Sequence, residues 1–189
     1  MKSAKDYLKA GDKYRQQKKW QAAVQAYTKA IELDPGDFRS YERCGRVYFE
    51  LGDYHQTIHN LTCAINLKPN RYLLYDLRGR AYSMLGNQEA VVSDFVKATE
   101  LHPGHNVYLH KALAFIELGD YSQALDALNR AIDLKVDYAI AYLTRGVIYQ
   151  TLGEKEKAKA DYEHTIDLAT NRKWSAQAKK YLQGLNETG

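Results

Sequence analysis

The sequence predicts an all-α protein built as a solenoid of antiparallel helix pairs, and three observations lead to this fold class. A helix-end sequence, KAIELDPGD at residues 29–37, recurs in related form along the chain. The recurrence has a period close to 34 residues, which is typical of arrays in which each repeat is a helix–turn–helix. Glycine and tyrosine also keep fixed positions within this period. These features indicate repeats that stack on one another and share a continuous core.

The recurring helix end defines five repeats and one further helix. Its later copies are CAINLKPNR, KATELHPGH, RAIDLKVDY and HTIDLATNR, which begin at residues 63, 97, 130 and 164. The expected repeats are 4–37, 38–71, 72–104, 105–138 and 139–172, and a C-terminal capping helix is expected at 173–186. Ser3, followed three residues later by Asp6, forms a capping-box-like pair that predicts the start of the first helix.

Two positions of the repeat hold eight of the twelve glycines. Position 8 lies inside a helical pattern, where glycine is about 1 kcal/mol less favourable than alanine, so we expect the backbones of two helices to approach each other closely there. Position 15 predicts that the first helix ends in the left-handed conformation that glycine adopts freely. Position 8 is occupied by Gly11, Gly45, Gly79, Ala112 and Gly146, and position 15 by Lys18, Gly52, Gly86, Gly119 and Gly153.

Aromatic and small residues complete the pattern of each helix pair. Positions 4, 11, 17 and 24 hold 13 of the 16 tyrosines, and an aromatic stripe locked to the packing period indicates a core. Positions 20 and 27 are mostly alanine, which would let the second helix pack closely on the first. Proline ends the first three repeats, whereas Val136 and Thr170 replace it later. We therefore expect a more helical junction after residue 134 and a direct run into the capping helix after 168.

The final helix is predicted to be amphipathic. Its apolar residues share one face and would cover the exposed edge of the last repeat, as an open solenoid requires. These residues are Trp174, Ala178, Tyr181, Leu182 and Leu185.

Composition narrows the classes of protein that remain. The chain has 189 residues, 45% hydrophobic and 26% charged, which is typical of a folded soluble protein. Its net charge of +4 is a mild excess, so nucleic-acid binding is not the expected function. No apolar run could span a membrane, and MKSAKDYLKAG lacks the apolar segment of a secretory signal. We expect a cytoplasmic protein in which Cys44 and Cys63 are reduced.

Candidates for chemistry are few. His55 and His59 lie four residues apart on one helix and could touch one metal, but no HExxH glutamate and no third ligand accompany them. Cys44 occupies a core position and does not resemble an exposed nucleophile. The sequence therefore predicts no catalytic residues, no metal, no cofactor and no enzymatic activity.

The pattern of aromatic residues at positions 4 and 11, glycine or alanine at 8, small residues at 20, alanine at 27 and proline at 32 resembles the tetratricopeptide repeat (TPR). The resemblance covers residues 4–172 and implies a right-handed superhelical solenoid. The chain departs from the pattern where Lys18 replaces glycine, where Val136 and Thr170 replace proline, and where Gln88 and Lys155 replace an aromatic residue.

The resemblance also implies a concave groove, lined by the first helices, that binds a peptide or helix of a partner protein. The groove would have a polar half formed by Lys5, Lys9, Asp12, Arg39, Glu42, Arg43, Arg46, Asp76 and Arg80. Its apolar half would be formed by Leu73, Leu77, Leu109, Leu113, Ile116, Ile140, Leu143 and Val147. We expect these leucines, isoleucines and valine to form an exposed patch, which would mark an interaction site unless the final helix covers it.

Charge in the polar half suggests the chemistry of a partner. Arg39 and Arg43 are like charges four residues apart on a helix, an unfavourable arrangement unless an anionic group meets them. Glu42 and Arg46, like Asp76 and Arg80, are pairs of opposite charge that could instead form a solvated face.

The expected function is that of a non-enzymatic scaffold or adaptor for a partner with acidic and apolar residues. TPR proteins that grip heat-shock chaperone tails use lysine, asparagine and arginine at five groove positions. Those positions here are Leu8, Asp12, Arg43, Leu73 and Leu77, so this clamp is absent. Two alternatives stay open: a self-assembling structural subunit, and RNA binding through the cluster Arg39, Arg43, Arg46 and Arg80.

Overall fold

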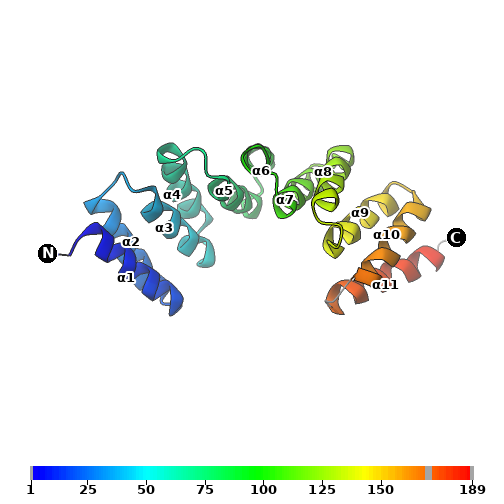
Figure 1. Ribbon diagram of the computed structural model, residues 1–189, viewed down its shortest axis with the longest axis horizontal. Helices are drawn as coiled ribbons and strands as arrows, with labels where there is room; N and C mark the ends of the chain where they lie inside the picture. The colour runs from blue at the N-terminus through cyan, green and yellow to red at the C-terminus, as the bar shows by residue number, and fades with distance from the viewer. Residues whose placement is uncertain (1, 169–171, 188–189) are drawn as a thin grey trace. The chain divides into compact units, whose positions relative to one another are not determined.

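The computed structural model describes residues 2–168 and 172–187, and over these residues every regular element is an α-helix. The all-α prediction is therefore confirmed. In chain order the helices are α1 (Ala4–Gln16), α2 (Trp20–Leu33), α3 (Phe38–Glu50), α4 (Tyr54–Leu67), α5 (Tyr72–Met84), α6 (Gln88–Leu101), α7 (His105–Glu117), α8 (Tyr121–Leu134), α9 (Ala139–Thr151), α10 (Lys155–Leu168) and α11 (Arg172–Glu187) (Figure 1).

The helices belong to two compact units. The N-terminal unit comprises residues 1–102 and holds α1 to α6, and the C-terminal unit comprises residues 103–189 and holds α7 to α11. Within each unit every helix packs against the next one in sequence. In addition α3 contacts α5 and α9 contacts α11, so first helices of successive pairs lie side by side.

Within each of the five pairs, three residues connect the two helices, as residues 17–19 connect α1 to α2. Connections this short return the chain antiparallel to itself. The predicted position for ending the first helix is confirmed, because Gly52, Gly86, Gly119 and Gly153 have φ angles between 72° and 78°. Lys18 adopts the same left-handed region at φ 56°.

Glycine at position 8 makes room for a large side chain from the second helix. A Cβ atom on Gly11 would lie 2.4 Å from Cε1 of Tyr27, and one on Gly146 would lie 2.7 Å from Cε1 of Tyr162. Position 8 is thus closely packed, but the expected contact between two helix backbones is not what requires glycine: the nearest atoms belong to the side chain at position 24. The corresponding pairs in the other repeats are Gly45–Leu61, Gly79–Phe95 and Ala112–Leu128.

The prediction of a more helical junction after residue 134 is wrong. Four residues separate α8 from α9, as many as separate α2 from α3, and Lys135 is extended with φ −149°. Tyr138 ends this turn and is held against α7, because its hydroxyl donates a hydrogen bond to Oδ1 of Asn106 at 2.7 Å and its ring meets His105 edge-on at 4.9 Å. The junction expected after residue 168 lies outside the described residues.

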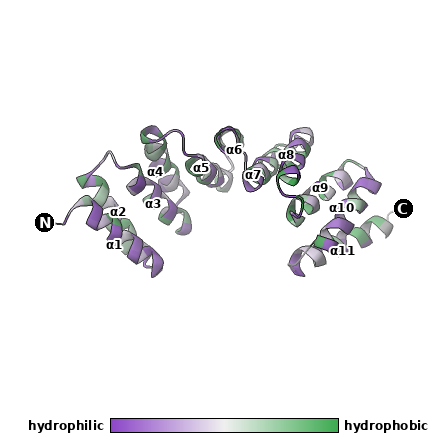
Figure 2. Ribbon diagram, in the orientation of Figure 1, coloured by the Kyte–Doolittle hydropathy of each residue, from purple (hydrophilic) through white to green (hydrophobic). Residues whose placement is uncertain are grey.

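Helix α11 packs its apolar face on the last pair. Ala178 and Leu185 are buried in a cluster with Tyr162, and Trp174 and Tyr181 pack against it. Hydrophilic and hydrophobic residues are interspersed along the helices (Figure 2). Among the described residues, no helix combines the length and the apolar character needed to cross a bilayer.

Candidate functional site

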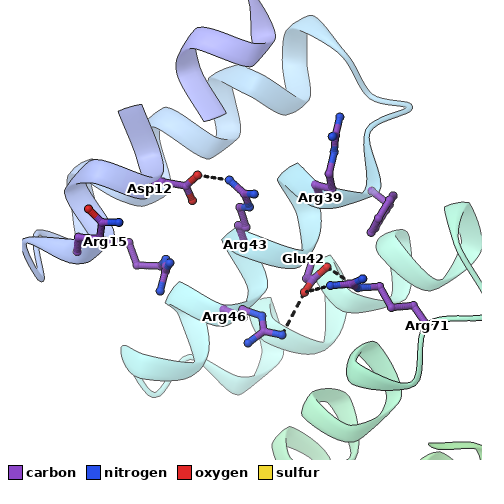
Figure 3. Close-up of a pocket in the computed structure, with 9 residues that line it drawn as sticks. Asp12, Arg15, Arg39, Glu42, Arg43, Arg46 and Arg71 are labelled. Atoms are coloured by element: carbon purple, nitrogen blue, oxygen red, sulfur yellow. Dashed lines mark hydrogen bonds and ion pairs between the residues drawn. The ribbon is translucent and has the colours of Figure 1, made fainter. Parts of the chain in front are cut away.

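The N-terminal unit contains a pocket rich in arginine, which we call the arginine pocket (Figure 3). Its volume is about 390 Å³. Helices α1 and α3 contribute most of its walls, and the residue before α5 closes one side. The lining residues are Asp12, Arg15, Gln16, Phe38, Arg39, Glu42, Arg43, Arg46 and Arg71.

Glu42 organises one side of the arginine pocket. Its side chain is only 8% exposed, and its Oε1 accepts hydrogen bonds from Nη2 of Arg46 at 3.1 Å and Nη2 of Arg71 at 3.3 Å. Nε of Arg71 also lies 2.9 Å from Oε2 of Glu42, at ion-pair distance. The pair expected between Glu42 and Arg46 is therefore present, and Arg71 joins it from the turn before α5. A buried carboxylate shared by two guanidinium groups fixes both of them in place.

Asp12 organises the opposite side. It forms an ion pair with Arg43 and accepts a hydrogen bond from the Tyr27 hydroxyl at 2.9 Å. Burial, reinforced by the neighbouring Asp12 carboxylate, raises the pKa of Tyr27 well above its usual value. The Tyr27 phenol therefore remains protonated and donates to Asp12, which orients this carboxylate toward Arg43.

Intrachain carboxylates meet both arginines that the sequence left without a partner. Arg43 pairs with Asp12, and Nε of Arg39 lies 2.7 Å from Oδ1 of Asp37. The hydrogen bond to Asp37 raises the pKa of Arg39. The like charges of Arg39 and Arg43 are thus balanced within the chain, and their spacing alone does not require an external anion.

The other predicted polar residues lie outside the arginine pocket. Lys5 and Lys9 are exposed on α1, and Asp76 is half-buried on α5. Arg80 lies with its guanidinium 4.8 Å from the ring centre of Phe49 and lines a neighbouring cavity of about 290 Å³. Arg46 lines both cavities.

The C-terminal unit contains a second pocket, of about 500 Å³, which we call the apolar pocket. None of its lining side chains is charged. The hydroxyls of Thr144 and Thr151 are satisfied within α9, since they donate to the carbonyls of Ile140 and Val147 at 2.8 and 2.9 Å. The lining residues are Leu113, Ile116, Tyr121, Leu143, Thr144, Val147, Ile148, Thr151, Trp174, Gln177 and Tyr181.

The expected apolar patch is smaller than the sequence suggested. Leu113 and Val147 are exposed at 42% and 37%, and Ile116 is half-buried, whereas Leu143 is buried although it lines the pocket. Leu109 belongs to the buried core between α7 and α8. The remaining predicted residues do not line the pocket: Ile140 is half-buried, Leu73 is half-buried in the N-terminal unit, and Leu77 is buried beside Arg80.

Helix α11 forms one wall of the apolar pocket and leaves it open. Trp174, Gln177 and Tyr181 line it, while Leu113 and Val147 keep their exposure. Sequence reasoning placed Trp174 and Tyr181 on the covering face of α11 but did not assign them to a pocket. Their aromatic character could have indicated a role in a pocket, since alanine or leucine would cover the last repeat equally well.

The candidates for chemistry remain isolated from one another. Burial raises the pKa of the Cys44 thiol to about 12, so this thiol is protonated near neutral pH and is not an activated nucleophile. Over residues 2–168 and 172–187, no three side chains of histidine, cysteine, aspartate or glutamate are arranged as metal ligands.

Stacked helix pairs with pockets on their first helices define a helical-repeat protein. A TPR repeat profile matches residues 11–52 and 112–153, and a tetratricopeptide repeat profile matches residues 139–172. The chain belongs to the tetratricopeptide repeat family, as its pattern of glycine, tyrosine and alanine predicted. Proteins of this family are typically non-enzymatic and act in protein–protein interaction.

Solved structures share the fold at low sequence identity. MamA superposes with a TM-score of 0.81 and 23% identity, covering 84% of this chain and 93% of MamA. YrrB, a TPR protein with an unusual peptide-binding site, superposes with a TM-score of 0.81 and 21% identity, covering 94% of this chain and 92% of YrrB.

Among curated proteins, RNA polymerase II-associated protein 3 of Xenopus tropicalis is 36% identical over 78 residues. The protein of the same name from Xenopus laevis matches equally well. The match covers 41% of this chain but only 11% of either relative's length.

Proposed function

We propose that this protein is a non-enzymatic adaptor that binds segments of partner proteins on the first helices of its repeats. The observation that carries the proposal is the apolar pocket, an open cavity of about 500 Å³ whose lining has no charged side chain. Family membership supports the same conclusion, and so does the peptide-binding site described for YrrB.

The apolar pocket suits apolar side chains of a partner segment. Leu113 and Val147 would lose their contact with water on binding, and burying apolar surface contributes about 25 cal/mol per Å². A charged side chain would lose its hydration without gaining a partner among the lining residues. An amphipathic helix that inserts two or three apolar residues is the segment that fits this lining best.

The arginine pocket suits acidic side chains. Arginines outnumber carboxylates among its lining residues, so an acidic segment would meet an excess of positive charge. The proposed partner therefore carries apolar residues for the C-terminal unit and acidic residues for the N-terminal unit, and each contact can be tested separately.

Affinity capture with two matched variants tests the apolar contact. Leu113 lines the pocket at 42% exposure, and Leu118 has nearly the same exposure, 43%, but lies outside it. We expect Leu113→Asp to lose partners that the unmodified protein captures, whereas Leu118→Asp should retain them, because only the first change places a charge in the pocket.

Circular dichroism of both variants would establish that they are folded. If folded Leu113→Asp captured every partner as efficiently as Leu118→Asp, the apolar pocket would not be the binding site.

A further inference from the structure

Three arginines of the arginine pocket are held by intrachain carboxylates inside the pocket and remain partly exposed. Glu42 holds Arg46 and Arg71, and Asp12 holds Arg43 (Figure 3). The three arginine side chains nevertheless keep 34% to 42% of their surface exposed. A guanidinium group has five N–H donors, so a contact with one carboxylate leaves others to bind a second anion. Arginines fixed before binding also lose less conformational entropy when a ligand arrives.

The charge of the pocket indicates the charge of the ligand. Arg39 is neutralised by Asp37 and points away from Glu42 (Figure 3). Four other arginines, including Arg15, line the pocket together with two carboxylates, which leaves an excess of two positive charges. A phosphomonoester carries a charge of about −1.5 to −2 near neutral pH and three acceptor oxygens, whereas a single carboxylate carries −1 and two. Arginine matches phosphate geometry with two parallel hydrogen bonds.

We propose that the arginine pocket binds a phosphorylated serine or threonine side chain of a partner peptide. The inference rests on the proposed adaptor function and specifies the anionic group that the N-terminal unit recognises. Arg46 and Arg71 would bind the phosphate oxygens with the donors that Glu42 does not use, and Arg43 and Arg15 would supply the remaining positive charge.

An RNA phosphate fits the pocket less well than a phosphopeptide. Single-stranded RNA is usually held by bases that stack on open aromatic faces as well as by its phosphates. The faces of the aromatic rings near this pocket are already in contact with guanidinium groups, which would compete with a base for the same faces. Arg71 lies 5.7 Å from the ring centre of Phe38, and Arg80 lies 4.8 Å from that of Phe49.

Binding to three matched peptide arrays tests the inference. The arrays share degenerate flanks and carry phosphoserine, aspartate or serine at the centre. We expect the labelled protein to bind phosphoserine peptides about tenfold more tightly than the matched aspartate peptides, in keeping with a charge-assisted contact by several arginines. This advantage should shrink as the pH falls through about 6, where the phosphate gains a proton.

Pocket variants locate the contact. Arg71→Gln and Arg15→Gln should each lower phosphopeptide affinity at least about fivefold, since the first removes a charge-assisted contact and the second removes one of the two excess positive charges of the pocket. Arg130→Gln, an exposed arginine of the C-terminal unit, is the matched control and should bind as the unmodified protein does. Using Arg15, which lies on the exposed face of α1, keeps the test informative if Arg71→Gln does not fold.

Several outcomes would overturn the inference. Equal binding of aspartate and phosphoserine peptides would reject phosphate recognition but leave the adaptor function standing. A loss in Arg130→Gln equal to that in Arg71→Gln would reject the pocket as the site. Tighter binding of a labelled single-stranded RNA than of any phosphopeptide would assign the pocket to nucleic acid. Failure of all peptides to bind, together with failure of the unmodified protein to capture any partner, would reject the adaptor function as well.

Discussion

Lys18 adopts the left-handed backbone conformation that glycine adopts at the same position of the other four repeats. A side chain with a Cβ is unfavourable in this region by roughly 1 kcal/mol. The side chain of Lys18 is exposed, and no packing of its own compensates for this conformation.

We expect Lys18→Gly to stabilise the protein by about 0.5–1 kcal/mol, because glycine adopts a positive φ without a steric penalty. Urea unfolding monitored by circular dichroism would measure the change in midpoint. The reverse substitution, Gly52→Lys, provides the comparison: an added Cβ there meets nothing within 4 Å, so its destabilising effect would be conformational. An unchanged midpoint for both variants would contradict this account.

The arginine pocket shows which residues of the site could be predicted. Glu42 and Arg46 lie one helical turn apart, and the sequence indicated their pairing. Arg71 lies 29 residues from Glu42 and precedes α5, outside any helical periodicity. Its role depends on how α5 packs against α3, and a contact between distant segments leaves no local signal in the sequence.

The same arrangement of polar residues occurs in the third and the fifth helix pair. In α9, Arg145 binds both oxygens of Asp161 on α10, at 2.7 and 2.8 Å, and donates to Asn129 on α8 at 2.7 Å. In the N-terminal unit, Arg78 binds Asp94 and Thr62 in the same way. Each arginine lies on the first helix of its pair. It thus connects the second helix of that pair to the second helix of the preceding pair.

This arrangement was visible in the sequence but not recognised. The third and fifth repeats have both arginine at position 7 and aspartate at position 23. The other three repeats have neither residue at its position. Joint occurrence sixteen residues apart indicates a contact between the two helices of a pair. The prediction of the helices themselves was easier, since glycine, tyrosine and alanine recur in almost every repeat.

We expect a double-mutant cycle on Arg145→Met and Asp161→Asn to give a coupling energy of about 1–2 kcal/mol. The two side chains are 20% and 6% exposed, so each contributes more than a surface pair but less than a fully buried one. Thermal or urea unfolding of the four proteins would supply the energies.

The surface pair Arg130 and Asp133, at 3.8 Å and about 70% exposure, is the control, and its cycle should lie within about 0.5 kcal/mol of zero. Similar coupling in both cycles would mean that the Arg145 pair contributes no more than a solvated one.

At the scale of the molecule, the chain contains two compact units with cores of their own. One cluster in the N-terminal unit includes Tyr27, Ala30 and Val47, while clusters in the C-terminal unit surround Leu128 and Tyr162. The sequence analysis did not predict the division into two units after His102. A repeat period is the same for every helix pair, so it does not show how strongly successive pairs associate.

We expect residues 1–102 and 103–189, produced separately, each to be helical and to unfold cooperatively, because each contains complete helix pairs and a core. Circular dichroism during thermal unfolding would measure this. The C-terminal fragment should also retain the apolar pocket, all of whose lining residues it contains. A fragment without helical signal under native conditions would show that its stability depends on the rest of the chain.

The sizes of the side chains at position 8 and position 24 must match, and this has a consequence for recombination among these repeats. Tyr162 and Tyr27 each require glycine opposite them, whereas Leu128 tolerates Ala112. Both members of a match lie within one repeat, on its two helices. Exchange of whole repeats between homologous genes, with crossovers in the turns between pairs, keeps the members together. A crossover between the two helices of a pair can place tyrosine against alanine, so viable chimeras should carry their crossovers between pairs.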